Sequence, residues 1–118
     1  METKMANRRL FSKTIFYSDK FSTLTPDAAK LYVYMMLEAD DDGFMGHTRQ
    51  IIKMAEVEGA ALDMLIDCGF VIRFKSGVCV ITHWHIHNLV KRSGYSPTDF
   101  VAEKSLVYLN EEHAYALK

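Results

Sequence analysis

The chain has few of the residues that mark the specialised classes of protein. Its 118 residues include only 2 cysteines and 2 prolines, which excludes a disulfide-stapled scaffold and a proline-rich linker. No run approaches the roughly 20 consecutive apolar residues of a membrane-spanning helix, so we expect no membrane contact. The first nine residues are polar and basic and lack the apolar stretch of a secretory signal, which predicts a cytoplasmic protein.

The two cysteines fit that compartment. Cys68 and Cys79 form no C-x-x-C pair, and each lies in an apolar run, one late in a helix pattern and one in a strand pattern. We interpret both as small buried hydrophobic residues.

The chain also lacks an excess of charge of either sign. Lysine and arginine total 14, and aspartate and glutamate total 15, which gives a net charge of −1 at pH 7. DNA-binding domains usually carry a basic excess, because neutralising phosphates supplies much of their affinity. Any DNA contact here must come from a local group of basic residues, the alternative being scattered charge that serves solubility. The DNA-binding candidates are Arg8, Arg9, Lys13, Arg49, Lys53, Arg73, Lys75, Lys91 and Arg92.

What the chain does have is apolar periodicity, which is strongest over residues 25–39. Thr25 is suited to cap a helix, Pro26 to occupy its first position, and Asp27 to complement its positive end. Apolar residues then recur at helical spacing on most sides, which predicts a largely buried helix at the centre of the fold.

Two more helices are expected after a possible short strand at residues 44–45. Thr48 can cap the first of them, which reaches about residue 55 with its apolar residues on one face. The next helix ends at Cys68, because Gly69 accepts the left-handed conformation that terminates helices.

A β-hairpin is expected next, from two runs rich in β-branched and aromatic residues at 70–74 and 78–82. The turn between them contains a glycine. Residues 8–24 are expected to form a short helical or extended lead-in, and residues 100–109 a C-terminal helix.

This order of elements is that of a winged helix-turn-helix. We therefore predict an α+β, mainly helical fold with a three-helix core, a β-hairpin wing, an N-terminal lead-in and a C-terminal helix. The prediction is a single domain over residues 1–118, with its core at about 8–90 and an extension at 91–118. Any other small α+β domain with three helices and a hairpin is the alternative.

The third helix of this pattern is acidic, which argues against the usual reading of bases in the major groove. Residues 56–68 contain four acidic residues and no lysine or arginine, so the helix would repel phosphates. It also offers no arginine, asparagine or glutamine for the common base-edge contacts. We interpret its outward face as solvated or as a protein interface, formed by Ala60, Asp63, Met64 and Asp67.

Two clusters are typical of metal sites, and we assign a metal or other cofactor to neither. A continued strand would place His83, His85 and His87 on one face, but no carboxylate or cysteine ligand lies near, and a packed Trp-His corner is the alternative. The acidic run before Gly43 resembles a calcium loop, yet Arg49 falls where the bidentate glutamate should be. Helix termination and a turn explain that run.

No catalytic motif is present in the sequence. It contains no glycine-rich phosphate loop, no G-x-S-x-G and no H-E-x-x-H. We therefore expect no enzyme activity.

Several short phrases, spread in order over residues 8–103, resemble a known family. The phrases are Arg9-Leu10-Phe11-Ser12-Lys13, Leu31-Tyr32, Ala39-Asp40-Asp41-Asp42-Gly43-Phe44, Phe70-Val71-Ile72 with Ser76-Gly77-Val78, and His83-Trp84 with His87-Asn88 and Tyr95-Ser96-Pro97-Thr98. Together they resemble the N-terminal domain of phage replisome organisers, a group related to DnaD-type replication-initiation proteins. His85 is this sequence's own choice within them.

The resemblance implies a winged-helix fold and a role in phage or prophage DNA replication. Such proteins are expected to help assemble the initiation complex at an origin and to recruit a helicase or helicase loader. In DnaD-type relatives the winged helix is associated with self-assembly, while a separate C-terminal domain carries much of the DNA binding. We therefore expect a homo-oligomer. The chain ends at Lys118, and whether it is part of a longer protein stays open.

Three functions follow as hypotheses. The first is a replication-initiation module that mainly contacts proteins and holds DNA weakly through basic residues. The second is a transcription regulator that binds a specific DNA sequence with the wing and the second helix. The third is a metal-dependent enzyme that uses the histidines.

Overall fold

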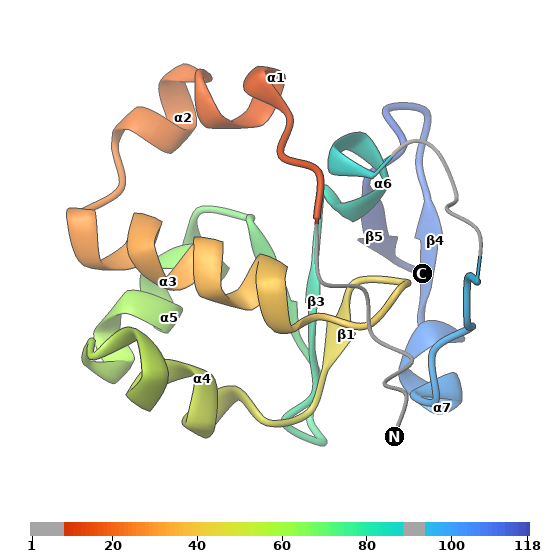
Figure 1. Cartoon of the computed structure of the whole chain (residues 1–118). Coiled ribbons are helices and arrows are strands. Elements are labelled where there is room, and N and C mark those ends of the chain that lie inside the picture. Colours follow the sequence, from red (N-terminus) through yellow and green to blue (C-terminus); the bar gives the residue numbers. More distant parts are fainter. Residues whose placement is uncertain (1–8, 89–93) are drawn as a thin grey trace.

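Three helices pack together on one side of the molecule, and two small antiparallel sheets lie on the other (Figure 1). The computed structural model describes residues 9–88 and 94–118. The helices are α1 (Lys13–Phe16), α2 (Asp19–Ser22), α3 (Pro26–Glu38), α4 (Thr48–Ala55), α5 (Gly59–Asp67), α6 (Trp84–His87) and α7 (Val101–Lys104). The strands are β1 (Phe44–Met45), β2 (Val71–Arg73), β3 (Cys79–Ile81), β4 (Val107–Leu109) and β5 (Tyr115–Leu117). The α+β, mainly helical class is confirmed.

Helix α3 begins as its sequence predicts. The Thr25 hydroxyl accepts a hydrogen bond from the Ala28 backbone N–H, and Pro26 occupies the first turn. The face toward α4 and α5 is fully buried. The expectation of burial on most sides is wrong, because Leu37 is 44% exposed and its neighbours Val33 and Tyr34 are partly exposed.

The starts and ends of α4 and α5 agree with the sequence except at one cap. Gly69 has a φ of +83°, the left-handed conformation that ends a helix without steric cost. Thr48 does not cap α4: the capping position is His47, and Thr48 is the first helical residue. The Thr48 hydroxyl instead donates to the Gly77 carbonyl, 3.4 Å away in the turn after β2.

The predicted hairpin is present as β2 and β3, and β3 lies at the centre of its sheet. The strand order is β1-β3-β2, and both pairs are antiparallel. Val80 of β3 pairs with Phe44 on one side and Ile72 on the other. Among the described residues, no helix is both long and apolar enough to cross a bilayer.

The predicted C-terminal helix over residues 100–109 is wrong. Only α7 is helical, and β4 follows it and pairs with β5. The side chain of Asn110 forms the turn by accepting from the backbone N–H groups of Glu112 and Ala114. Val107 of β4 and Tyr115 of β5 are buried, so each strand of the hairpin contributes a side chain to the core.

The acidic loop, which we define as Asp40, Asp41 and Asp42, joins segments that are distant in sequence. Asp40 accepts hydrogen bonds from the Phe44 N–H at 2.9 Å and from the Thr98 hydroxyl. Asp42 accepts from the Thr98 N–H at 2.9 Å. These bonds fix the segment before α7 against the turn that follows α3.

Aromatic residues complete the contacts of Asp42. The Tyr95 hydroxyl donates to its carboxylate at 2.7 Å, and the Tyr115 hydroxyl donates to its carbonyl at 2.8 Å. Lys104 places its ammonium 3.5 Å from the same carboxylate. Burial and the neighbouring aspartates raise the pKa of Tyr95 to about 12, so this phenol stays protonated and remains a donor.

Arg9 and Ser12 both hold the N-terminal segment against the body of the fold. The Arg9 guanidinium lies 3.3 Å from the Asp41 carboxylate, donates to the Ala39 carbonyl at 2.6 Å and stacks over the Trp84 ring. The Ser12 N–H donates to His87 Nδ1 at 2.8 Å. Because Nδ1 accepts, the proton of the neutral ring is on Nε2, which faces the Tyr32 hydroxyl at 2.8 Å.

The first prediction concerns the acidic loop. Asp42→Ala removes the acceptor of Tyr95 and of the buried Thr98 N–H, and leaves donors without partners. We expect the free energy of unfolding to fall by about 2–4 kcal/mol, measured by urea denaturation. Asp67→Ala, at an exposed carboxylate of α5, is the control and should change it by less than about 0.5 kcal/mol. Equal losses in the two variants would contradict this role of the loop.

The second prediction concerns pH. Burial lowers the pKa of His87 to about 4, below the ordinary value of 6.5. The unfolded chain therefore binds more protons between pH 6.5 and 4, and stability falls as the pH falls through that window, by up to about 3 kcal/mol. His87→Gln removes this titration, so urea midpoints at pH 7 and pH 4 should differ less in the variant. His83, whose pKa burial also lowers, titrates in both proteins.

Candidate nucleic-acid interface

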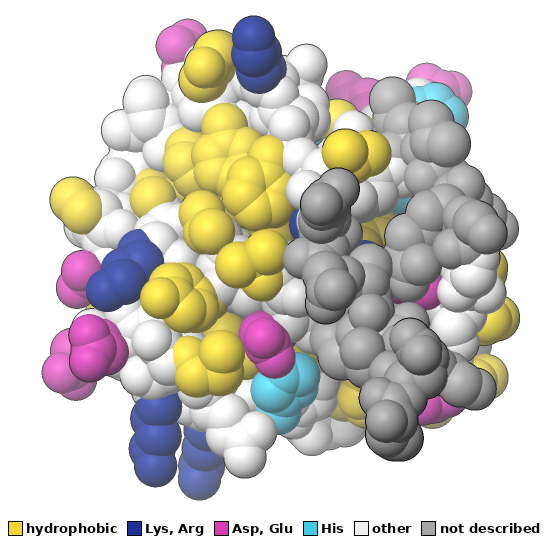
Figure 2. Space-filling model, viewed as in Figure 1, with side chains coloured by type: hydrophobic (Ala, Val, Ile, Leu, Met, Phe, Trp, Pro, Cys, Tyr) yellow, Lys and Arg dark blue, Asp and Glu magenta, His cyan; other side chains and the backbone are white. Residues whose placement is uncertain are grey.

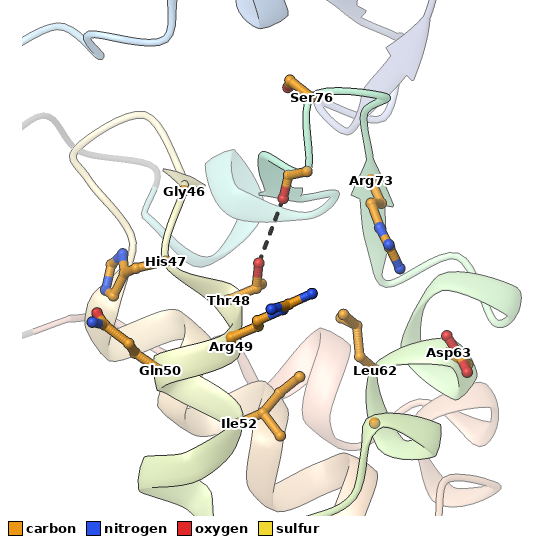
Figure 3. A pocket seen from close by; sticks show the side chains of 12 residues that line it. Gly46, His47, Thr48, Arg49, Gln50, Ile52, Leu62, Asp63, Arg73 and Ser76 are labelled. Atoms are coloured by element: carbon orange, nitrogen blue, oxygen red, sulfur yellow. Dashed lines mark hydrogen bonds between the residues drawn. The ribbon is translucent and has the colours of Figure 1, made fainter.

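A hollow of about 550 Å³ lies where the starts of α4 and α5 face the β2–β3 hairpin (Figure 3). One wall of the hollow is the start of α4 with the two residues before it, namely Gly46, His47, Thr48, Arg49 and Gln50. A second wall is formed by α5, through Gly59, Leu62 and Asp63. A third wall is formed by the hairpin, through Arg73, Ser76 and Gly77. The Thr48–Gly77 hydrogen bond connects two of these walls and fixes the hairpin turn beside α4.

Two arginines from different elements share this hollow. Figure 3 shows the side chains of Arg49 from α4 and Arg73 from β2 directed into the space between the helices and the hairpin. Both residues are exposed, and neither forms an ion pair with any residue that the structure describes. A pair of solvated guanidiniums at a concave surface is suited to bind phosphate groups.

Backbone groups add to the positive potential of the hollow. The first N–H groups of an α-helix have no intrahelical acceptor, and the helix dipole places partial positive charge there. The starts of both α4 and α5 line the hollow, and neither helix has a side-chain cap. Asp63 opposes this potential from α5, so the positive side of the hollow is the one formed by α4 and the hairpin.

The structure separates the nine basic candidates into groups. Of the six candidates that the structure describes, only Arg49 and Arg73 line the hollow. Lys53 is exposed further along α4, and Lys75 is exposed in the hairpin turn. Lys13 is exposed on α1, which lies on the opposite side of α3 from α4 (Figure 1). The candidates Arg8, Lys91 and Arg92 lie outside the described residues.

Arg9 is a correction to the list of DNA-binding candidates. Its side chain is only 4% exposed and is occupied by Asp41, the Ala39 carbonyl and the Trp84 ring. A guanidinium so enclosed supports the fold and is not a surface cation. The sequence could not show this, because Asp41 and Arg9 are 32 residues apart.

The candidate protein interface on α5 is also changed by the structure. Ala60, Asp63 and Asp67 are exposed as expected. Met64 is instead half-buried, packs against the core, and its sulfur accepts from the Thr25 hydroxyl at 3.7 Å. The exposed face of α5 is therefore acidic and has no large apolar side chain at its centre.

The three histidines have structural contacts. The continued strand that the metal hypothesis requires is absent, because Trp84–His87 is the helix α6. His85 Nε2 lies 3.1 Å from the Tyr115 hydroxyl, and His87 holds Tyr32 and Ser12. No three histidine, cysteine or acidic side chains within residues 9–88 and 94–118 are grouped so as to hold a metal ion.

An exposed apolar face, which sequence reasoning missed, covers the outer side of α3. Figure 2 shows hydrophobic side chains gathered over α3 and between α3 and the α1–α2 segment. The outward stripe of α3 includes Tyr34 and Leu37, and Phe11 is exposed while it stacks on Phe16. The signal was in the sequence: Val33, Tyr34 and Leu37 add an apolar stripe opposite the core-facing one.

Comparisons of the chain with protein-family models, curated proteins and solved structures give no match.

Proposed function

We propose that this chain is a winged helix-turn-helix module that serves phage DNA replication initiation by holding duplex DNA weakly and by assembling proteins, without catalysis. The order of α3, β1, α4, α5, β2 and β3, and the sheet order β1-β3-β2, support the winged-helix assignment. In that assignment α5 is the third helix and the β2–β3 hairpin is the wing. The replication role rests on the sequence resemblance.

The observation that carries the DNA proposal is the convergence of Arg49 and Arg73 on one hollow. Contacts to phosphate position a protein on DNA without reading its sequence. The acidic face of α5 opposes entry of that helix into the major groove, since it would face two rows of phosphates. DNA is therefore held at the α4 side of the hollow and by the wing, at modest affinity and with little sequence preference.

The alternative function, a transcription regulator that binds a specific sequence, has one observation in its favour. Gln50 lines the hollow beside Arg49, and these two side chains are suited to hydrogen-bond adenine and guanine edges. Strong discrimination between DNA sequences would support this alternative, because each wrong base pair costs about 1–3 kcal/mol in a specific complex.

The assembly part of the proposal is supported by the exposed face of α3. A stripe containing Tyr34 and Leu37 is suited to pack against a second apolar surface, and its aromatic and leucine side chains would supply the affinity. We place the self-association surface there, and not on the acidic face of α5.

The third prediction tests the hollow. Arg49→Ala with Arg73→Ala should weaken binding to random-sequence duplex DNA at least tenfold at low salt. The slope of log affinity against log salt should become shallower by about 2, one for each lost phosphate contact. Fluorescence anisotropy across a salt series measures both quantities.

The matched control for that experiment removes the same charge elsewhere. Lys13→Ala with Lys30→Ala changes two exposed cations on α1 and α3, outside the hollow. Affinity should change less than about threefold. If both double variants lose affinity equally, binding is a property of overall charge and the hollow is not the site. If wild-type protein does not bind at low salt, the DNA proposal is wrong.

The fourth prediction tests assembly. Leu37→Glu places a charge at the centre of the α3 face, and should weaken self-association by more than about tenfold, since burying an unpaired carboxylate is costly. Light scattering over a concentration series measures it. Val101→Glu is the control, because Val101 is 70% exposed on α7. A wild-type protein that stays monomeric at high concentration, or equal effects of the two variants, would rule out this face.

A further inference from the structure

A second concave surface, the groove, lies on the other side of the hairpin from α5. It has a volume of about 500 Å³ and runs between the hairpin turn and the C-terminal part of the chain, where α7, Leu106 and β5 line it. Its floor is apolar and is formed by Phe74, Ala102, Leu106 and Leu117. Leu106 is 52% and Leu117 60% exposed, so the floor presents apolar area that a ligand can remove from water.

The rim of the groove is charged and mainly basic. Arg73 and Lys75 line it from the hairpin, and neither has an ion-pair partner in the part of the chain that the structure describes. Glu103 lines it from α7, and its carboxylate accepts a hydrogen bond from the Ser76 hydroxyl at 2.7 Å. That bond ties the hairpin turn to α7 and gives the groove a fixed wall.

Arg73 lines both the groove and the hollow. Arg49 lines only the hollow, and Lys75 and the two leucines line only the groove. If a carboxylate in the groove forms an ion pair with Arg73, that guanidinium is no longer available to pair with a DNA phosphate in the hollow, and only Arg49 remains. The two concave surfaces are thereby linked through one side chain.

We propose that the groove binds a short segment of another protein in which carboxylates flank an apolar side chain, and that this segment competes with DNA for Arg73. The apolar side chain packs on Leu106 and Leu117, and the carboxylates pair with Arg73 and Lys75. Docking is independent of the proposed function, whereas the competition rests on it.

Charge and shape favour this occupant over others. Duplex DNA has charge of the right sign, but it presents mainly phosphates and sugars and keeps the faces of its bases stacked inside the helix, so it covers the apolar floor poorly. The α5 face of a second copy is acidic but lacks an exposed large apolar side chain. The β4–β5 turn of a second copy combines exposed Leu109 with Glu111 and Glu112, and is therefore the competing occupant that the test must separate.

The docking test uses ¹⁵N-labelled full chain and a short synthetic peptide in which glutamates flank leucine and phenylalanine. We expect the amide signals of Leu106, Leu117 and Lys75 to shift with saturation. A peptide with lysines in place of the glutamates, and one with serines in place of the apolar residues, should each bind at least tenfold more weakly. Equal binding of all three peptides, no saturable shift with the first, or shifts confined to other surfaces would overturn the proposal.

Variants assign the binding to the groove. Leu106→Ser with Leu117→Ser should weaken the affinity for the acidic peptide at least tenfold. Val101→Ser with Leu109→Ser is the matched control at exposed residues that do not line the groove, and should leave the affinity unchanged within twofold. If the control variant loses the peptide equally, the groove is not the site. If Glu111→Lys with Glu112→Lys abolishes a wild-type oligomer whose contacts cover the groove, the occupant is a second copy and the proposal is wrong.

The competition test separates failure of the groove from failure of the hollow. Arg49→Ala should weaken the affinity for DNA and leave the affinity for the peptide unchanged. The leucine double variant should weaken the affinity for the peptide and leave that for DNA unchanged. Arg73→Ala should weaken both affinities. Saturating peptide should reduce wild-type DNA affinity several-fold. If the peptide binds and DNA does not, the proposed DNA binding and the competition are both wrong, while the proposal that the groove docks a peptide is still supported. Simultaneous binding at undiminished affinities would overturn the competition.

Discussion

The carboxylates and carbonyls of the acidic loop hold together parts of the chain that are far apart in sequence. Asp41 forms an ion pair with Arg9 of the N-terminal segment. Asp42 accepts hydrogen bonds from Tyr95, Thr98 and Tyr115 of the C-terminal extension. Their negative charges are concentrated in a small volume, and burial raises the pKa of Asp40. The cluster is tolerable because backbone N–H groups, hydroxyls, a guanidinium and an ammonium surround it.

The geometry of both concave surfaces depends on this loop. Asp40 fixes the Phe44 N–H, and so the turn that leads through β1 to the start of α4, where Arg49 lies. Tyr95 and Thr98 fix the segment that leads to α7, which forms one wall of the groove and holds the hairpin through Glu103. The same few carboxylates thus set the position of the hairpin between its two neighbours.

The charge balance of the chain is understandable from this arrangement. Many of the acidic residues form structural contacts in the acidic loop or lie on the α5 face. The two arginines of the hollow lie on α4 and β2 and have no ion-pair partner among the described residues. A net charge near zero therefore coexists with a local basic surface. The acidic face of α5 lowers the positive potential of this surface, which agrees with the proposed function of weak DNA binding together with protein assembly.

The sequence by itself determined the elements whose causes are local. The cap of α3 at Thr25, the glycine end of α5 and the β2–β3 hairpin depend on neighbours a few residues apart, and each was predicted. Only the tertiary structure decided the outcomes for residues 83–87 and 100–109, the burial of Arg9, and which basic residues meet. An apolar run such as 106–109 is compatible with a helix or with a strand when its sequence is considered alone. The contacts that select one outcome, such as the pairing of Leu109 with Tyr115 and the ion pair of Arg9 with Asp41, form only when the chain is folded.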